Sequence, residues 1–145
     1  MKIFYLQDIP QNNKKIITVT LHESQKDNRF IVDPKNNHTL TIGIDKRKNI
    51  TRRMLYTLMK KVIVVSQQHK LKKIAVRFSD FSLPKIRMQA KDLAESLAIH
   101  FEMANFEFVH YKTPPDDGWD AIEEVYIIGP KNKAIEKGIE RGQII

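Results

Sequence analysis

The chain has 145 residues, a net charge of +8 and no cysteine. This length suits one domain that buries about 70% of its unfolded surface, so the fold needs neither disulfides nor a structural metal. The absence of cysteine excludes disulfides, thiolate metal sites and cysteine nucleophiles. No apolar run reaches the roughly 18 residues of a membrane span. We therefore expect a cytoplasmic protein with no membrane contact.

Four short runs rich in β-forming residues predict strands in the first third of the chain. They cover residues 3–6, 16–21, 29–32 and 39–44. In the last run Leu40, Ile42 and Ile44 alternate with small residues. This alternation predicts one buried face and one face of small residues that lies under a helix.

A helical pattern follows these strands. Its apolar residues recur three and four positions apart and are Met54, Leu55, Leu58, Met59, Val62 and Ile63. Thr51 is a good N-cap, and Ile50 is placed to pack against Leu55 as a hydrophobic staple. We predict a helix that starts after Thr51 and continues to about His69.

The next apolar run, residues 71–78, predicts a central strand. A second helix is predicted to begin near Pro84, with Ser82 as its cap, and to end at Asn105. Its apolar residues are Ile86, Ala90, Leu93, Ala94, Leu97, Ala98, Phe101 and Ala104. The aromatic segment 106–112 that follows is either a short strand or a packed loop, and we favour the loop.

Residues 122–128 predict another strand, and residues 131–145 a third helix. In this helix Ala134, Gly138 and Gly142 form a stripe that suits close packing. A glycine inside a helix costs about 1 kcal/mol relative to alanine, so close packing has to compensate. We interpret the helix as the start of a connector to a further, catalytic domain; the alternative is that Gly142 ends the helix and the last three residues fray.

Strands and helices alternate over residues 39–145, a pattern typical of a parallel sheet with helices on both faces. The sequence therefore predicts an α/β fold, a three-layer αβα sandwich with a mostly parallel mixed sheet. We treat residues 1–145 as a single domain because no linker, repeat or low-complexity tract interrupts them.

We find no catalytic, cofactor-binding or metal-binding constellation in the sequence. No two of the histidines stand at the spacing of metal ligands on one element; they are His22, His38, His69, His100 and His110. No serine lies in a nucleophile elbow, and no pair of glycines is spaced to cradle a phosphate. The chain by itself is therefore not expected to be an enzyme.

Charge is distributed unevenly. Residues 45–73 hold ten basic residues and one acidic residue, whereas residues 92–124 hold nine acidic residues and one basic residue. The basic part favours a contact with nucleic acid or with the acidic part of another subunit. The residues that we expect to make it are Arg52, Arg53, Lys60, Lys61, Lys72 and Lys73.

The second half of the chain resembles a known family. The stretch from Ala90 to Leu97, followed by Ala104-Asn105-Phe106-Glu107-Phe108 and Tyr111-Lys112, resembles the helix and aromatic loop in the amino-terminal domain of leucyl aminopeptidases. The segments Ile122-Glu123-Glu124-Val125 and Gly138-Ile139-Glu140-Arg141-Gly142 resemble the strand and the connector helix that follow there. The resemblance covers roughly residues 38–145, and the first 37 residues depart from it.

This resemblance implies a macro-domain-like fold and a non-catalytic domain of a cytoplasmic, homo-oligomeric metallopeptidase, a hexamer in that family. The catalytic machinery, with two divalent metal ions such as zinc or manganese, would lie in a carboxy-terminal domain of the same parent chain. This domain would contribute to assembly and to access to the active site. Two alternatives are a free-standing basic module that binds nucleic acid and, less favoured because a glycine loop is missing, a macro domain that binds ADP-ribose.

Overall fold

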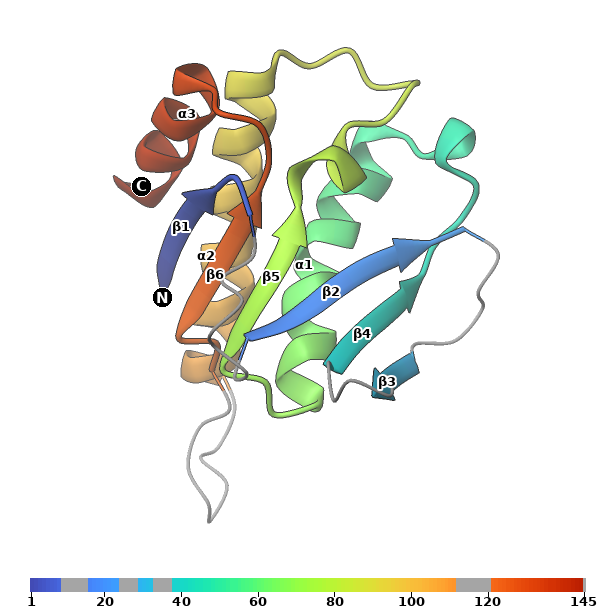
Figure 1. The fold of residues 1–145 in the computed structure, drawn as a ribbon, viewed down its shortest axis with the longest axis vertical. Coiled ribbons are helices and arrows are strands. Elements are labelled where there is room, and N and C mark those ends of the chain that lie inside the picture. The colour runs from blue at the N-terminus through green and yellow to red at the C-terminus, as the bar shows by residue number, and fades with distance from the viewer. Residues whose placement is uncertain (9–15, 24–28, 33–37, 112–120, 145) are drawn as a thin grey trace.

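The computed structural model describes residues 1–8, 16–23, 29–32, 38–111 and 121–144. They form one six-stranded sheet in the order β1-β6-β5-β2-β4-β3 (Figure 1). The strands are β1 (Lys2–Leu6), β2 (Ile16–His22), β3 (Arg29–Val32), β4 (His38–Gly43), β5 (Lys73–Arg77) and β6 (Glu124–Ile128). Neighbouring strands are parallel except for β3, which pairs antiparallel with β4 at one edge.

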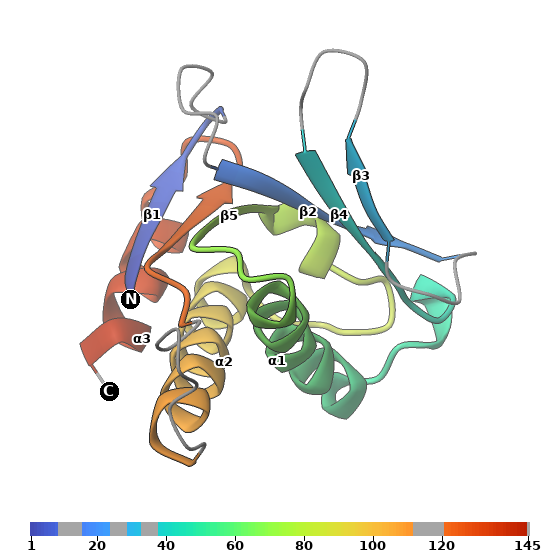
Figure 2. The same cartoon turned by 90° about the horizontal axis from the view of Figure 1, so that it is seen from below.

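Three α-helices flank the sheet, and two short 3-10 turns follow β4 and β5. The helices are α1 (Arg52–Gln68), α2 (Ala90–Tyr111) and α3 (Lys133–Ile144), and the turns are η1 (Arg47–Asn49) and η2 (Phe78–Phe81). Figure 2 shows α1 and α2 side by side against one face of the sheet, with α3 next to α2 near the β1 edge. The predicted α/β class and the mostly parallel mixed sheet are confirmed. In the described residues the helices cover one face of the sheet, which gives two of the three layers of the predicted αβα sandwich.

The core lies between the sheet and this helical layer. Alternate strand residues are fully buried there, for example Leu40 and Ile42 in β4 and Ile74 in β5. They meet apolar residues of α1 and α2 such as Met59 and Phe101, which are also fully buried. Period two in the strands and period 3.6 in the helices thus direct their apolar residues into one shared core.

The predicted start and end of α1 are confirmed. The Thr51 hydroxyl accepts a hydrogen bond from the backbone N–H of Met54 at 3.3 Å, and His69 follows the last helical residue. Ile50 and Leu55, the predicted staple pair, are both buried. The β-branched end of α1 stays helical because Val62, Ile63 and Val65 are buried, which outweighs their lower helix propensity.

The predicted bounds of the second helix are wrong at both ends. Residues 82–89 are not helical, and α2 begins at Ala90 rather than near Pro84. Leu83 is buried and Ile86 half-buried, so the core holds this segment as a non-helical connection. The predicted loop at 106–111 is also wrong, because α2 continues to Tyr111. No glycine or proline lies between Ala90 and Pro114, so nothing local ends the helix at Asn105.

Gly138 and Gly142 of the predicted stripe pack closely against α2, whereas Ala134, its third member, is exposed. A Cβ atom built at Gly138 would lie 2.3 Å from the backbone oxygen of Lys91, and one at Gly142 would lie 2.6 Å from the Cβ atom of Ala98. The helix starts at Lys133, two residues later than expected, and continues past Gly142 to Ile144. Gly142 therefore lies inside the helix, which contradicts the alternative that it forms the cap.

Candidate functional site

A groove of about 780 Å³ lies at the carboxyl edge of the parallel strands β2 and β4, beside the first half of α1. In open α/β sheets ligands characteristically bind outside the carboxyl ends of the strands. Its size falls within the range of about 300–1,000 Å³ that is usual for small-molecule sites. The groove is lined by Glu23, Gly43, Ile44, Asp45, Lys46, Ile50, Arg53, Met54, Thr57, Leu58 and Lys61.

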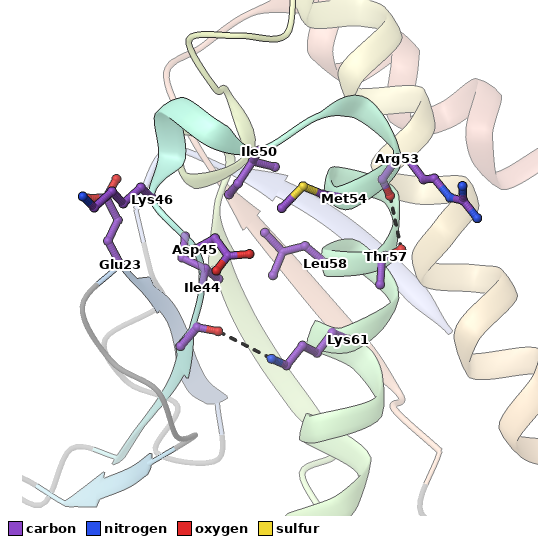
Figure 3. A pocket seen from close by; sticks show the side chains of 11 residues that line it. Glu23, Ile44, Asp45, Lys46, Ile50, Arg53, Met54, Thr57, Leu58 and Lys61 are labelled. Atoms are coloured by element: carbon purple, nitrogen blue, oxygen red, sulfur yellow. Dashed lines mark hydrogen bonds between the residues drawn. The ribbon is translucent and has the colours of Figure 1, made fainter.

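Apolar side chains form the floor of the groove. Ile50 and Leu58 are buried, whereas Met54 is 36% exposed although methionine is an apolar residue. These residues come from the turn before α1 and from the side of α1 that faces β4 (Figure 3). The groove therefore offers apolar surface to a ligand without any rearrangement of the core.

Two opposite charges are directed into the groove. Figure 3 shows the Asp45 carboxylate and the Lys61 ammonium group pointing into the space between β4 and α1, whereas the guanidinium group of Arg53 extends away from it. Lys61 donates a hydrogen bond to the backbone oxygen of Gly43 at 3.5 Å, which is at the limit for such a bond. Within the described residues, the Asp45 carboxylate has no hydrogen-bond or ion-pair partner.

Arg47 fixes the geometry of this edge. Its guanidinium group donates hydrogen bonds to the backbone oxygens of Leu21 at 3.1 Å and Asp80 at 3.3 Å. Its own backbone N–H donates to the Glu23 carboxylate at 2.8 Å. One side chain therefore joins β2 and η2 to the segment between β4 and α1, in which Asp45 lies.

The carboxyl group of Asp80 lies beside Arg47 in a partly buried position. Burial raises its pKa above the usual value for aspartate, and the positive charges of Arg47 and Arg77 oppose this effect in part. The distance from the Asp80 carboxylate to the Arg47 guanidinium group is 3.9 Å, at the limit of an ion pair. Desolvation thus outweighs the long contact with the cation.

The six predicted basic contact residues do not form one surface. Arg53 and Lys61 line the groove. Arg52 and Lys60 also belong to α1 but do not line the groove. Lys72 borders a second cavity of about 540 Å³ at the opposite end of the sheet. Lys73 forms an ion pair with Glu124 at 3.5 Å, so part of its charge is already compensated.

That second cavity adjoins a buried polar cluster. The Asn105 side chain accepts hydrogen bonds from the Ile122 backbone N–H at 2.9 Å and from the Gln67 side chain at 3.0 Å, and it donates one to the Ile122 backbone oxygen at 3.1 Å. Gln67 and Asn105 are both buried. These bonds fix the chain as it enters β6, and we assign the cluster a structural role.

The sheet face opposite the helices carries an aromatic pair. Phe4 of β1 and Tyr126 of β6 are stacked with ring centroids 5.1 Å apart, and Phe4 is 37% exposed. The Tyr126 hydroxyl donates a hydrogen bond to Glu124 at 2.6 Å. This bond, more than the nearby Lys73 charge, holds the pKa of the Glu124 carboxyl below its usual value.

The described ranges contain no group of three or more His, Cys, Asp and Glu residues that would hold a metal ion. None of their helices is both long and apolar enough to cross a membrane. The donor set for a dimetal centre is therefore not found in these residues.

The sequence did not predict that Asp45 and Lys61 line the same groove. The signal for one of the two residues is present, because Asp45 comes directly after the predicted strand at residues 39–44, where ligand-binding side chains gather. Lys61 was predicted only as a member of a basic helix surface. Its direction toward β4 follows from the packing of α1 beneath the sheet.

The strand order, the flanking helices and the groove define an α/β domain with a mostly parallel sheet. No protein-family model matches the chain, and no curated protein matches it. Among solved structures, the fold is similar to that of a mutant of tomato leucine aminopeptidase, with a TM-score of 0.62 and 9% sequence identity. The likeness covers 99% of this chain and 35% of that chain, and at this identity it shows the fold alone.

Proposed function

We propose that this chain is the non-catalytic amino-terminal domain of a leucyl-aminopeptidase-like metallopeptidase of the cytoplasm. The observation that carries the proposal is the fold likeness, which extends over 99% of this chain but only 35% of the aminopeptidase chain. The resemblance of the segments around Ala90, Asn105 and Gly142 supports it from the sequence side. In this proposal the domain contributes to homo-oligomer assembly and to access to the active site.

The two divalent metal ions of such a peptidase would be held by the carboxy-terminal domain. The described residues of this chain do not fit as their ligands, because they contain no suitable cluster of His, Asp and Glu. We therefore assign no catalytic step to this chain. Its contribution to the parent protein would be structural, through the surfaces of the sheet and of the helices.

The coding sequence that follows residue 145 tests this proposal. We expect it to continue into a domain with a carboxylate-and-lysine dimetal site, and a stop codon there would contradict the proposal. In the parent protein, removal of residues 1–130 is expected to lower the native mass of the oligomer while the bound metal remains. Hydrolysis of an aminoacyl amide by this chain alone would also contradict it.

A free-standing nucleic-acid-binding module is the second candidate. The first turn of α1 carries Arg52 and Arg53 and no acidic residue. The amino end of a helix is already partly positive, so two arginines there are electrostatically unfavourable unless an anion lies nearby. Phosphate groups of a nucleic acid would supply that charge.

A further inference from the structure

The groove between β4 and α1 combines features that together select one kind of ligand. Its floor is apolar, with Ile44, Ile50, Met54 and Leu58 in the lining. A purely polar ligand would leave this surface in contact with water and gain nothing from it. The body of a ligand must therefore be apolar, since burying apolar surface is the main source of affinity in such a site.

The charges in the groove restrict the ligand further. Asp45 and Lys61 both point into the space, one from the strand side and one from the helix side (Figure 3). A ligand with a single positive or negative charge would pair with one of them and repel the other. A ligand that carries both an ammonium and a carboxylate group pairs with both at once.

Both groups are free to bind. The Lys61 ammonium makes one long hydrogen bond, to the backbone oxygen of Gly43, and keeps its other two donors. Within the described part of the chain, Asp45 has no partner. The Arg53 side chain, which also lines the groove, extends away from the space between β4 and α1 (Figure 3). The Glu23 carboxylate is already partly compensated, because it forms an ion pair with Arg47 at 3.8 Å and accepts a hydrogen bond from the Arg47 backbone N–H.

The backbone around the two charges is well fixed. Arg47 ties the segment after β4 to β2 and η2, and Thr51 caps α1. The Thr57 hydroxyl donates to the backbone oxygen of Arg53 at 3.2 Å, so its oxygen remains available as an acceptor toward the groove. A site held by rigid elements loses little entropy when a ligand binds.

We infer that this groove binds small zwitterions in which an apolar chain separates the two charged groups, with the ammonium group on Asp45 and the carboxylate on Lys61. Such binding does not depend on the proposed function, because every residue of the groove belongs to this chain. A peptidase assay tests the proposed function and a ligand titration tests the groove, so either proposal can fail without the other.

A titration followed by amide NMR tests this inference with ω-aminooctanoate as the probe. We expect shifts at the amides of residues 43–46 and 53–61. Octanoate and octylamine, which each lack one charge, are expected to bind about fivefold more weakly, because an exposed ion pair contributes that much. β-Alanine keeps both charges but lacks the apolar chain, and we expect it to bind at least about tenfold more weakly.

Two substitutions test the contributions of Asp45 and Lys61 one at a time. Asp45→Asn is expected to lower the affinity for ω-aminooctanoate to that of octanoate, and Lys61→Gln to lower it to that of octylamine. Lys60→Gln changes the neighbouring residue, which does not line the groove, and should leave the affinity unchanged. Equal binding of the three octyl probes, shifts outside the groove, or no shift at millimolar concentration would overturn the inference.

Discussion

The side chain of Asn105 bonds both backbone polar groups of Ile122, which lies seventeen residues further along the chain. This pair joins the third quarter of α2 to the chain two residues before β6. Because both residues are buried, the bonds are made where water cannot replace them. The contact explains why Asn105 lies inside a helix rather than at its end.

We expect Asn105→Ala to lower the free energy of unfolding by about 3 kcal/mol. The substitution leaves the Ile122 N–H, the Ile122 oxygen and the Gln67 amide without partners in a buried site. Urea unfolding monitored by circular dichroism measures this loss.

Gln67→Met is the matched comparison for Asn105→Ala. Within the described residues, the side-chain oxygen of Gln67 is buried and has no partner, so its removal offsets the loss of one hydrogen bond. We expect a change of less than about 1 kcal/mol. A larger loss for Gln67→Met than for Asn105→Ala would show that Asn105 is not the centre of the cluster.

Gly138→Ala should destabilise the protein although alanine is the better helix former. The new Cβ atom would lie 2.3 Å from the backbone oxygen of Lys91, so α3 has to move away from α2. Overpacking of this kind costs about 1–3 kcal/mol, and the gain in helix propensity of about 1 kcal/mol compensates only part of it. Thermal unfolding measures the difference.

Glu140→Ala on the exposed side of the same helix serves as the control. It adds no atom to the interface with α2, and we expect it to change stability by no more than about 0.5 kcal/mol. An increase in stability for Gly138→Ala would contradict the close packing of the two helices.

The raised pKa of Asp80 predicts a specific pH dependence of stability. The folded protein holds the proton of this carboxyl group to higher pH than the unfolded chain does. Its contribution to stability is therefore complete below the usual carboxyl pKa of about 4 and is lost as the pH rises through the raised value. Asp80→Asn removes this loss.

We expect the stability of Asp80→Asn relative to the unchanged protein to increase as the pH rises from about 4 toward neutrality. Urea unfolding at several pH values measures the trend, and the comparison cancels the titration of the other carboxyl groups. A relative stability that falls with rising pH would mean that the contact with Arg47 outweighs burial.

If α1 contacts nucleic acid, reversal of its charges should abolish the contact. Substitution of Arg52, Arg53, Lys60 and Lys61 by Glu is expected to reduce the slope of log affinity against log salt concentration by about 3–4. Fluorescence anisotropy with labelled duplex DNA measures this slope. No binding by the unchanged protein at low salt would exclude this function.

The matched control reverses four exposed basic residues on or next to α3, which are Lys131, Lys133, Lys137 and Arg141. This control changes the net charge by the same amount. If it reduces binding equally, the affinity reflects the total charge of the protein and not a surface on α1.

The sequence by itself determined the order and type of most elements. The four early strands, the central strand at residues 73–77 and α1 with its Thr51 cap are all visible in local patterns. The close packing of α3 was also predictable, because two glycines inside a helix need a compensating contact. These features depend on residues within one or two turns of each other, so a linear pattern contains them.

Only the tertiary structure decided where α2 begins and ends and which charges meet in the groove. The role of Asn105 depends on a distant part of the chain, because its side chain bonds the backbone of Ile122 and does not cap the helix. The opposition of Asp45 and Lys61 depends on the side of α1 that packs beside β4 (Figure 3). The spacing of apolar residues along the chain shows which side of each helix or strand faces the core. Which polar residues then face each other depends on how one element packs on another.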